Sequence, residues 1–467
     1  MTAYPAFEDI RSLRTLLTSG KISVPELVAF FAERIDRHNA VSRAFITVTA
    51  AEAAEEAATL SKSDLSRTPL AGVPYASKDL IDIAGVKTTA GSRVFHDRIA
   101  REDAFVITRL RGAGALSMGK TNLHEFAYGA TGENEVYGTC VNAYDTTRLA
   151  GGSSSGSAAA VAFGLVPAAL GTDTGGSVRA PAALNGLVGL KPTIGRVPTS
   201  GIVPYCWTLD HVGIITRTIA DSADLLEAIS GHDTRDPASV NLPFETYSDA
   251  LGRGISGIKV GIPADFFFDR CDPQILDALE GVKAHLVQRG AELVPVALPD
   301  MEQTRTVSLT VQMPEALSAH SAYLETRGDL YSADFRAGLA VGQCILAEHY
   351  VKAKRFIETY RQQTSALFDQ VDVILTPATP EIAQKVGTVN IRRDRIDEAI
   401  GNAITRYTSF FNMTGHPALT MPCGMHSEGL PIGLQLVGRY FDEKTLFRVA
   451  FDIERNAAFS IPLPAVD

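Results

Sequence analysis

Short apolar runs alternate with helix-forming segments along most of the chain, and this alternation limits the possible folds more than any other feature. Runs typical of buried strands lie at 73–78, 115–118, 166–170, 258–262, 293–296, 371–375, 418–421 and 432–437. Helical patterns lie between them at 103–112, 155–164, 218–230, 273–289 and 442–455, and a long helical region at about 312–370 breaks near Gly328. The pattern predicts an α/β fold in which helices cover both faces of a mixed central β-sheet.

The N-terminal part of the chain is expected to be mainly helical. Ser23 can cap a helix whose apolar residues recur at helical spacing, and the Ala/Glu-rich stretch 50–62 favours another helix after a β-like run at 44–49. Neither a low-complexity linker nor an internal repeat divides the remaining sequence. We therefore predict a single domain, residues 1–467, with a helical segment at about 1–65.

Composition and charge argue against several classes of protein. A net charge of −10 without a long basic run disfavours a nucleic-acid partner, because a phosphate-binding groove needs clustered Lys and Arg. No window resembles a membrane-spanning helix and the N-terminus lacks the regions of a signal peptide, so a cytoplasmic protein is expected. The five cysteines have no CxxC spacing, which favours buried thiols over a disulfide framework or a zinc site (Cys140, Cys206, Cys271, Cys344 and Cys423).

Two short motifs indicate different kinds of enzyme. Residues 114–121, GALSMGKT, match the phosphate-loop pattern G-x-x-x-x-G-K-[ST], but the variable residues Ala-Leu-Ser-Met favour a strand over an open loop. Residues 152–156, GSSSG, match the nucleophile elbow of α/β-hydrolases. No apolar strand precedes them, although His320, His349 and His416 follow as candidate partners. A longer pattern, which contains GSSSG, is more specific than either of these two short motifs.

The longer pattern occupies three consecutive blocks. It runs from GGSSSGSAAAV at 151–161 through GTDTGGSVRAP at 171–181 to GLVGLKPT at 186–193, and it resembles the signature block of the amidase signature family. Other segments also resemble that family: its lysine motif at 69–79, its G-A-x-x-x-G-K-T-N strand at 114–122, and its C-terminal segment at 417–424 and 430–435. The resemblance spans roughly residues 20 to 455.

This resemblance implies an amide hydrolase with a Ser–Ser–Lys triad and with neither a metal nor another cofactor. Ser177 would be the nucleophile, Ser153 the serine that relays the proton, and Lys78 the base. The separation 177 − 153 = 24 matches the family pattern and selects Ser153 over the serines beside it. A cis peptide after Gly152 is also expected.

The proposed chemistry requires an uncharged lysine. A serine hydroxyl is a weak nucleophile until a base takes its proton, and lysine can be that base only when neutral. Lowering its pKa from about 10.4 to roughly 7–8 corresponds to about 3–4 kcal/mol, which burial on the predicted strand would supply. The same relay then protonates the leaving nitrogen, because an unprotonated amine is a very poor leaving group.

The glycine-rich turn that ends in Ser177 is a candidate oxyanion hole. It carries four successive amides, and its glycines allow conformations that aim such amides at one point (Thr174, Gly175, Gly176 and Ser177). The alternative is an ordinary Gly-Gly turn, and the flanking match favours the oxyanion hole. Ser154 is expected to hydrogen-bond Lys78, and Asp173 is expected to pair with Arg179 and brace the loop.

The expected substrate is a small amide. Two sets of residues are candidates for binding it: Tyr128, Gly129 and Ala130 in a loop, and Trp207, Tyr407, Phe410 and Phe411 as the border of an apolar acyl pocket, with core packing as the alternative for the aromatic set. In the glutamine-amidase subunit of aminoacyl-tRNA amidotransferases, which the chain also resembles, an Asp ten residues before a Gly binds the glutamine ammonium. Thr405 occupies that position here, which favours a stand-alone amidase. Carbamate, ureido and hydrazide hydrolases, a homodimeric assembly and an inactive partner subunit are left open.

Overall fold

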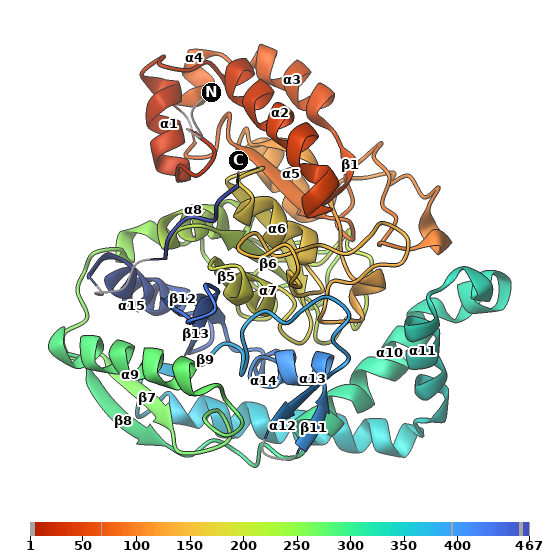
Figure 1. Cartoon of the computed structure of the whole chain (residues 1–467), viewed down its shortest axis with the longest axis vertical. Coiled ribbons are helices and arrows are strands. Elements are labelled where there is room, and N and C mark those ends of the chain that lie inside the picture. The colour runs from red at the N-terminus through yellow and green to blue at the C-terminus, as the bar shows by residue number, and fades with distance from the viewer. Residues whose placement is uncertain (1–4, 67, 394–395, 457–460, 467) are drawn as a thin grey trace.

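A mixed β-sheet forms the centre of the molecule (Figure 1). The computed structural model describes residues 5–66, 68–393, 396–456 and 461–466. Within them, eleven strands form one sheet in the order β1-β3-β2-β4-β6-β5-β12-β13-β9-β7-β8, and β10 and β11 form a separate hairpin. Strand β2 pairs in parallel with β3 and β4, and β7 with β8 and β9, whereas the other pairs are antiparallel. The predicted fold class is confirmed.

The strands are short and mostly buried. Their bounds are β1 Phe45–Val48, β2 Pro74–Lys78, β3 Leu116–Thr121, β4 Ala168–Asp173, β5 Val188–Lys191, β6 His211–Thr216, β7 Lys259–Pro263, β8 Glu292–Val296, β9 Val373–Pro377, β10 Asn390–Arg393, β11 Ile396–Ala399, β12 Ala418–Met425 and β13 Pro431–Gly438.

Helices pack around this sheet, and α10 and α11 extend away from it at the right of Figure 1. The α-helices are α1 Ile10–Thr18, α2 Val24–Ser42, α3 Ala50–Thr59, α4 Lys62–Leu65, α5 Phe105–Gly112, α6 Ser155–Ala162, α7 Arg179–Leu184, α8 Ile219–Ile229, α9 Pro273–Gln288, α10 Thr304–Arg327, α11 Ala333–Cys344, α12 Ala347–Leu367, α13 Ile400–Thr405, α14 Phe410–Thr414 and α15 Glu443–Asn456. Short 3₁₀ turns lie at Arg93–Phe95, Glu125–Ala127, Ser248–Ala250 and Gly328–Leu330. Among the described helices, none is both long enough and apolar enough to cross a bilayer.

Buried apolar side chains form two clusters on opposite faces of the sheet. On β4, Ala168 and Leu170 belong to the larger cluster, and Ala169 between them belongs to the smaller one. Ile214 and Ile215 of β6 divide between the clusters in the same way. Successive side chains of a strand point to opposite faces, so this division shows that the central strands are covered on both sides.

Local signals fixed most elements close to their predicted positions. Ser23 caps α2 as expected: its hydroxyl accepts a hydrogen bond from the Glu26 amide and the Glu26 side chain accepts one from the Ser23 amide. The long helical region begins earlier than predicted and consists of α10, α11 and α12, with the expected break after Arg327. Strands β5, β6 and β10–β11 and the short helices α7, α13 and α14 were not predicted.

The carboxyl ends of two parallel strands bring the candidate site together. Lys78 is the last residue of β2, and β4, which pairs with β2, ends at Asp173. The serine-rich segment before α6 and the glycine-rich turn before α7 lie at this same edge. Ligands of α/β proteins commonly bind in a crevice outside the carboxyl ends of such strands.

Candidate active site

Lys78 is completely buried and its ammonium group contacts hydroxyls. Its Nζ donates to Ser153 Oγ at 2.8 Å and to Thr172 Oγ1 at 2.8 Å, with the Thr172 carbonyl oxygen at 3.5 Å. Burial lowers the pKa of Lys78 to about 7, although the negative charges of Asp210 and Asp173 act in the opposite direction. This is the shift that a lysine base requires at neutral pH, and desolvation is its main cause.

The serine-rich segment places Ser153 beside Lys78 and Ser154 elsewhere. The Gly152–Ser153 peptide is cis, as expected. The predicted hydrogen bond between Ser154 and Lys78 is wrong: Ser154 Oγ donates to the Thr172 carbonyl at 3.0 Å and accepts from the Thr172 amide at 3.3 Å. Ser154 therefore connects this segment to β4, and Thr172 occupies the position beside Lys78 that was predicted for Ser154.

Ser177 lies in the turn between β4 and α7 and lines a cavity of about 780 Å³. Its carbonyl oxygen accepts the Ser154 amide at 3.1 Å, which joins the two serine-bearing segments. Within the described part of the chain, no hydrogen bond joins the hydroxyls of Ser153 and Ser177. Catalytic hydrogen bonds are often long in free enzymes and tighten when substrate binds.

The glycine-rich turn has fewer available amides than predicted. The Gly176 amide donates to Asp173 Oδ1 at 2.8 Å, so the structure does not support its assignment to an oxyanion hole. Thr174, Gly175 and Ser177 line the cavity and remain candidates. Gly176 is needed for another reason: its φ is +125°, and a Cβ would lie 2.0 Å from Thr408 Oγ1.

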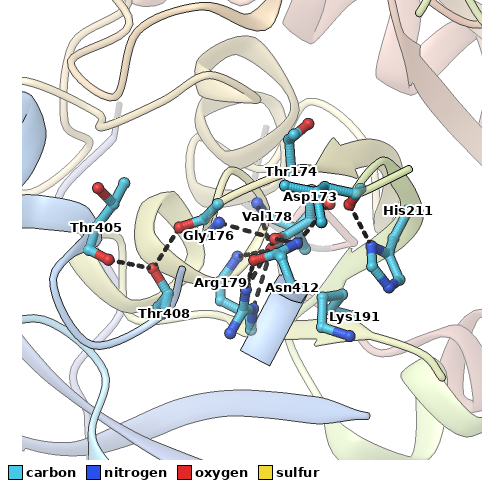
Figure 2. Close-up of polar contacts among 12 residues, drawn as sticks. Asp173, Thr174, Gly176, Val178, Arg179, Lys191, His211, Thr405, Thr408 and Asn412 are labelled. Atoms are coloured by element: carbon cyan, nitrogen blue, oxygen red, sulfur yellow. Dashed lines mark hydrogen bonds and ion pairs between the residues drawn. The ribbon is translucent and has the colours of Figure 1, made fainter. Parts of the chain in front are cut away.

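A buried ion pair braces this turn (Figure 2). As expected, Arg179 and Asp173 pair, with Nη2 to Oδ1 at 2.9 Å and Nε to Oδ2 at 3.0 Å. Asn412 Nδ2 also donates to Asp173 Oδ1 at 2.8 Å, and the amides of Gly176 and Val178 donate to the same carboxylate. Burial alone would raise the pKa of Asp173, but the Arg179 charge and these donors hold it well below its usual range.

The two predicted groups of substrate-binding residues differ in their position relative to the cavity. Tyr128, Gly129 and Ala130 line it beside Ser177. None of the four predicted aromatic pocket residues is among the described residues that line it (Trp207, Tyr407, Phe410 and Phe411).

Each of these aromatic residues has a different environment from the one predicted. Trp207 is 53% exposed and borders a separate small pocket. Tyr407 is buried, donates its hydroxyl to the Asp269 carbonyl at 2.6 Å and packs against Phe267. Phe410 is buried against Tyr360 and Phe411. Core packing, the alternative considered for these residues, accounts for Tyr407, Phe410 and Phe411.

The two competing motifs have structural roles. Residues 116–121 of the apparent phosphate loop form β3, and Lys120 is buried in an ion pair with Asp79 at 2.9 Å. Among the described residues, no histidine side chain hydrogen-bonds Ser153, Ser154 or Ser177, as a nucleophile elbow would need. Within those residues, too, no three His, Cys, Asp or Glu side chains are grouped to hold a metal ion, and all five cysteines are free.

Four polar residues of the site were not predicted as such. Thr172 contacts Lys78, Asp210 accepts the Thr174 hydroxyl at 2.5 Å, and Tyr205 and Arg305 line the cavity. Thr172 lies within the recognised block, so its position could have suggested a role. The other three lie outside the recognised blocks, and no local pattern marks them.

Comparison with known proteins identifies the family of this chain. Residues 26–447 match the sequence profile of the family described as Amidase. The chain belongs to the amidase family. Family membership makes it a hydrolase of C–N bonds.

Relatives of this amidase-family chain cover nearly its whole length. It is 41% identical over 389 residues to an amidase of Pseudomonas putida, covering 83% of this chain and 82% of that protein. It is 35% identical over 484 residues to a glutamyl-tRNA(Gln) amidotransferase subunit of Persephonella marina, covering 98% of both. A solved structure of a vestigial protein complex, described as revealing the evolutionary origins of an s-triazine catabolic enzyme, is similar with a TM-score of 0.92 and 32% identity over 97% of this chain and all (100%) of that one.

Proposed function

We propose that this chain hydrolyses a small amide with Ser177 as the nucleophile, Ser153 as the relaying serine and Lys78 as the base. The observation that carries the proposal is the environment of Lys78. It is fully buried, its pKa is lowered to about 7, and its Nζ lies 2.8 Å from a serine hydroxyl and forms no ion pair with a described carboxylate. A buried lysine of this kind is suited to gain and lose a proton near neutral pH.

The proposed reaction uses one relay in both directions. Neutral Lys78 takes the Ser153 proton while Ser153 takes the Ser177 proton, and Ser177 Oγ attacks the amide carbon. The amides of Thr174, Gly175 and Ser177 would stabilise the oxyanion that forms. Lys78 then returns its proton through Ser153 to the nitrogen, the C–N bond breaks, and an ester remains on Ser177. Water attacks this ester with the same relay, releasing a carboxylic acid and free Ser177.

A glutamine-amidase subunit is the second candidate, because one such subunit is 35% identical over 98% of both chains. That function needs a group that binds the glutamine ammonium, and the resemblance places it at Thr405. Thr405 lines the cavity, but its hydroxyl donates to the Gly401 carbonyl at 2.8 Å and carries no charge. This substitution favours hydrolysis of free amides that lack an α-ammonium group.

Covalent labelling tests the assignment. A fluorophosphonate should modify Ser177, located by mass spectrometry of the digested protein. Ser177→Ala should lose both the label and amide hydrolysis, and Ser153→Ala should label much more slowly. Ser154→Ala is the matched control, since Ser154 contacts β4 and not Lys78. An adduct on Ser154, or no adduct on the active wild-type protein, would contradict the proposal.

A further inference from the structure

Two polar side chains of the cavity have unsatisfied hydrogen-bonding groups. Arg305, near the start of α10, and Tyr205, in the loop before β6, both line the cavity that contains Ser177. Arg305 Nε and the Tyr205 hydroxyl are each buried without a hydrogen-bond partner. Within the described residues, no ion pair or hydrogen bond engages any part of the Arg305 guanidinium. A buried charged donor without an acceptor is unfavourable, so its presence in a binding cavity points to a ligand that supplies the acceptor.

Arg305 and Tyr205 belong to one polar group. The Tyr205 ring, only 3% exposed, packs edge-on against Tyr128 with the ring centroids 6.2 Å apart. Burial raises the pKa of both phenols, and the Arg305 charge acts in the opposite direction on each. The guanidinium therefore lies within electrostatic range of both hydroxyls.

The acidic groups near this cavity have other partners or no direct contact with Arg305. Glu133 accepts the Gly387 amide at 3.0 Å, and the Asp334 carboxylate lies 3.6 Å from His124 Nε2. Glu398 interacts with Arg305 only at longer range, since it forms no ion pair with it. Arg305 is the only Lys or Arg among the described residues that line the cavity.

We propose that Arg305 and Tyr205 form a carboxylate-binding subsite, so that the preferred substrates are amides that also carry a carboxylate. The guanidinium presents paired donors that match the two oxygens of a carboxylate, and the phenol supplies a further donor. This inference rests on the proposed function, because it names the substrate class of the same site. It also explains how an anion could be held by a protein whose net charge is −10.

Matched acid and ester substrates test the subsite. Malonamate, succinamate and glutaramate would each be compared with their methyl esters, following ammonia release. The wild-type protein should prefer at least one acid over its ester by about tenfold or more in kcat/KM. Arg305→Gln should lower kcat/KM for that acid by about 10- to 100-fold, mainly by raising KM. It should change kcat/KM for the ester by no more than about twofold. Tyr205→Phe should have a smaller effect, about three- to tenfold.

Lys352→Gln is the charge-matched control, because Lys352 is exposed on α12 and pairs with Glu348. This substitution should change kcat/KM for neither the acid nor the ester. Equal use of acid and ester by the wild-type protein, or equal loss on both in Arg305→Gln, would overturn the subsite while leaving the proposed amidase function in place.

If no amide is hydrolysed, calorimetric titration with malonate, succinate and glutarate tests the carboxylate subsite independently of the proposed reaction. Binding of one of these dicarboxylates that Arg305→Gln weakens at least about tenfold supports the subsite even though the proposed reaction fails. Absence of binding to all three overturns the subsite.

Discussion

Activity should rise with pH as Lys78 loses its proton, because only the neutral amine can act as a base. With a pKa of about 7 instead of 10.5, about three-quarters of Lys78 would be neutral at pH 7.5, against about 0.1% for an unperturbed lysine. Burial thus increases the reactive fraction by nearly three orders of magnitude. The expected profile of kcat/KM is a one-proton rise centred near pH 7, measured by ammonia release from an amide without titratable groups.

The same burial should make the folded protein less stable at low pH. Unfolded Lys78 holds its proton up to about pH 10.5, whereas folded Lys78 releases it near pH 7. The free-energy cost of burying the protonated lysine is therefore fully present below pH 7 and disappears above pH 10.5. The shift of 10.5 − 7 = 3.5 units corresponds to at most about 5 kcal/mol. Between pH 6 and pH 9 the cost should fall by about 2–3 kcal/mol.

Lys78→Met isolates this effect. The free energy of unfolding, from urea titrations followed by circular dichroism, should rise with pH in the wild-type protein relative to this variant. The pH dependence is decisive because the loss of the hydrogen bonds to Ser153 and Thr172 adds only a constant difference. Lys352→Met, which removes an exposed lysine, should show no such trend. A flat kcat/KM profile, or a pH-independent difference between wild type and Lys78→Met, would refute the reasoning.

Three other substitutions test the surroundings of Lys78. Asp210→Asn should move the rise in kcat/KM to lower pH, because the Asp210 charge raises the pKa of Lys78; an unchanged midpoint would contradict this electrostatic coupling. Gly176→Ala should destabilise the protein by more than about 2 kcal/mol in urea unfolding, since its φ is +125° and its Cβ would clash with the facing loop. Gly281→Ala, in open space on α9, is its control and should stabilise by up to about 1 kcal/mol. Arg179→Ala should cost about 3–5 kcal/mol by leaving a buried carboxylate without its cation, and a cost below about 1 kcal/mol would show that the ion pair does not brace the turn.

The sequence was most informative where neighbouring residues determine structure. Apolar runs located β2, β3, β4 and β9, and a capping box located the start of α2. The recognised motifs also placed Lys78 at the end of β2, where the pairing of β2 with β4 brings it to the serine-rich segment.

Contacts between distant segments could not be predicted in this way. Asn412 reaches Asp173 across 239 positions, and Thr408 donates to the Gly175 carbonyl across 233. Tyr407 and Phe410 are next to these polar residues in the sequence, yet their rings point into the core. Aromatic character alone therefore predicted the wrong acyl pocket, because burial in the core and exposure to a cavity favour the same residue types.

The partners of buried cations distinguish structural from reactive groups in this chain. Lys120 and Arg179 are buried against carboxylates at 2.9 Å, and Lys191 donates to two backbone carbonyls. These carboxylate and carbonyl acceptors hold the side chains in place but have no proton to donate. Lys78 instead contacts two hydroxyls, which can both give and take protons, and Arg305 has neither a hydrogen-bond partner nor an ion-pair partner among the described residues. Since a charged donor without an acceptor is unfavourable, Lys78 beside Ser153 and Arg305 in the Ser177 cavity are better explained by reaction and binding than by folding.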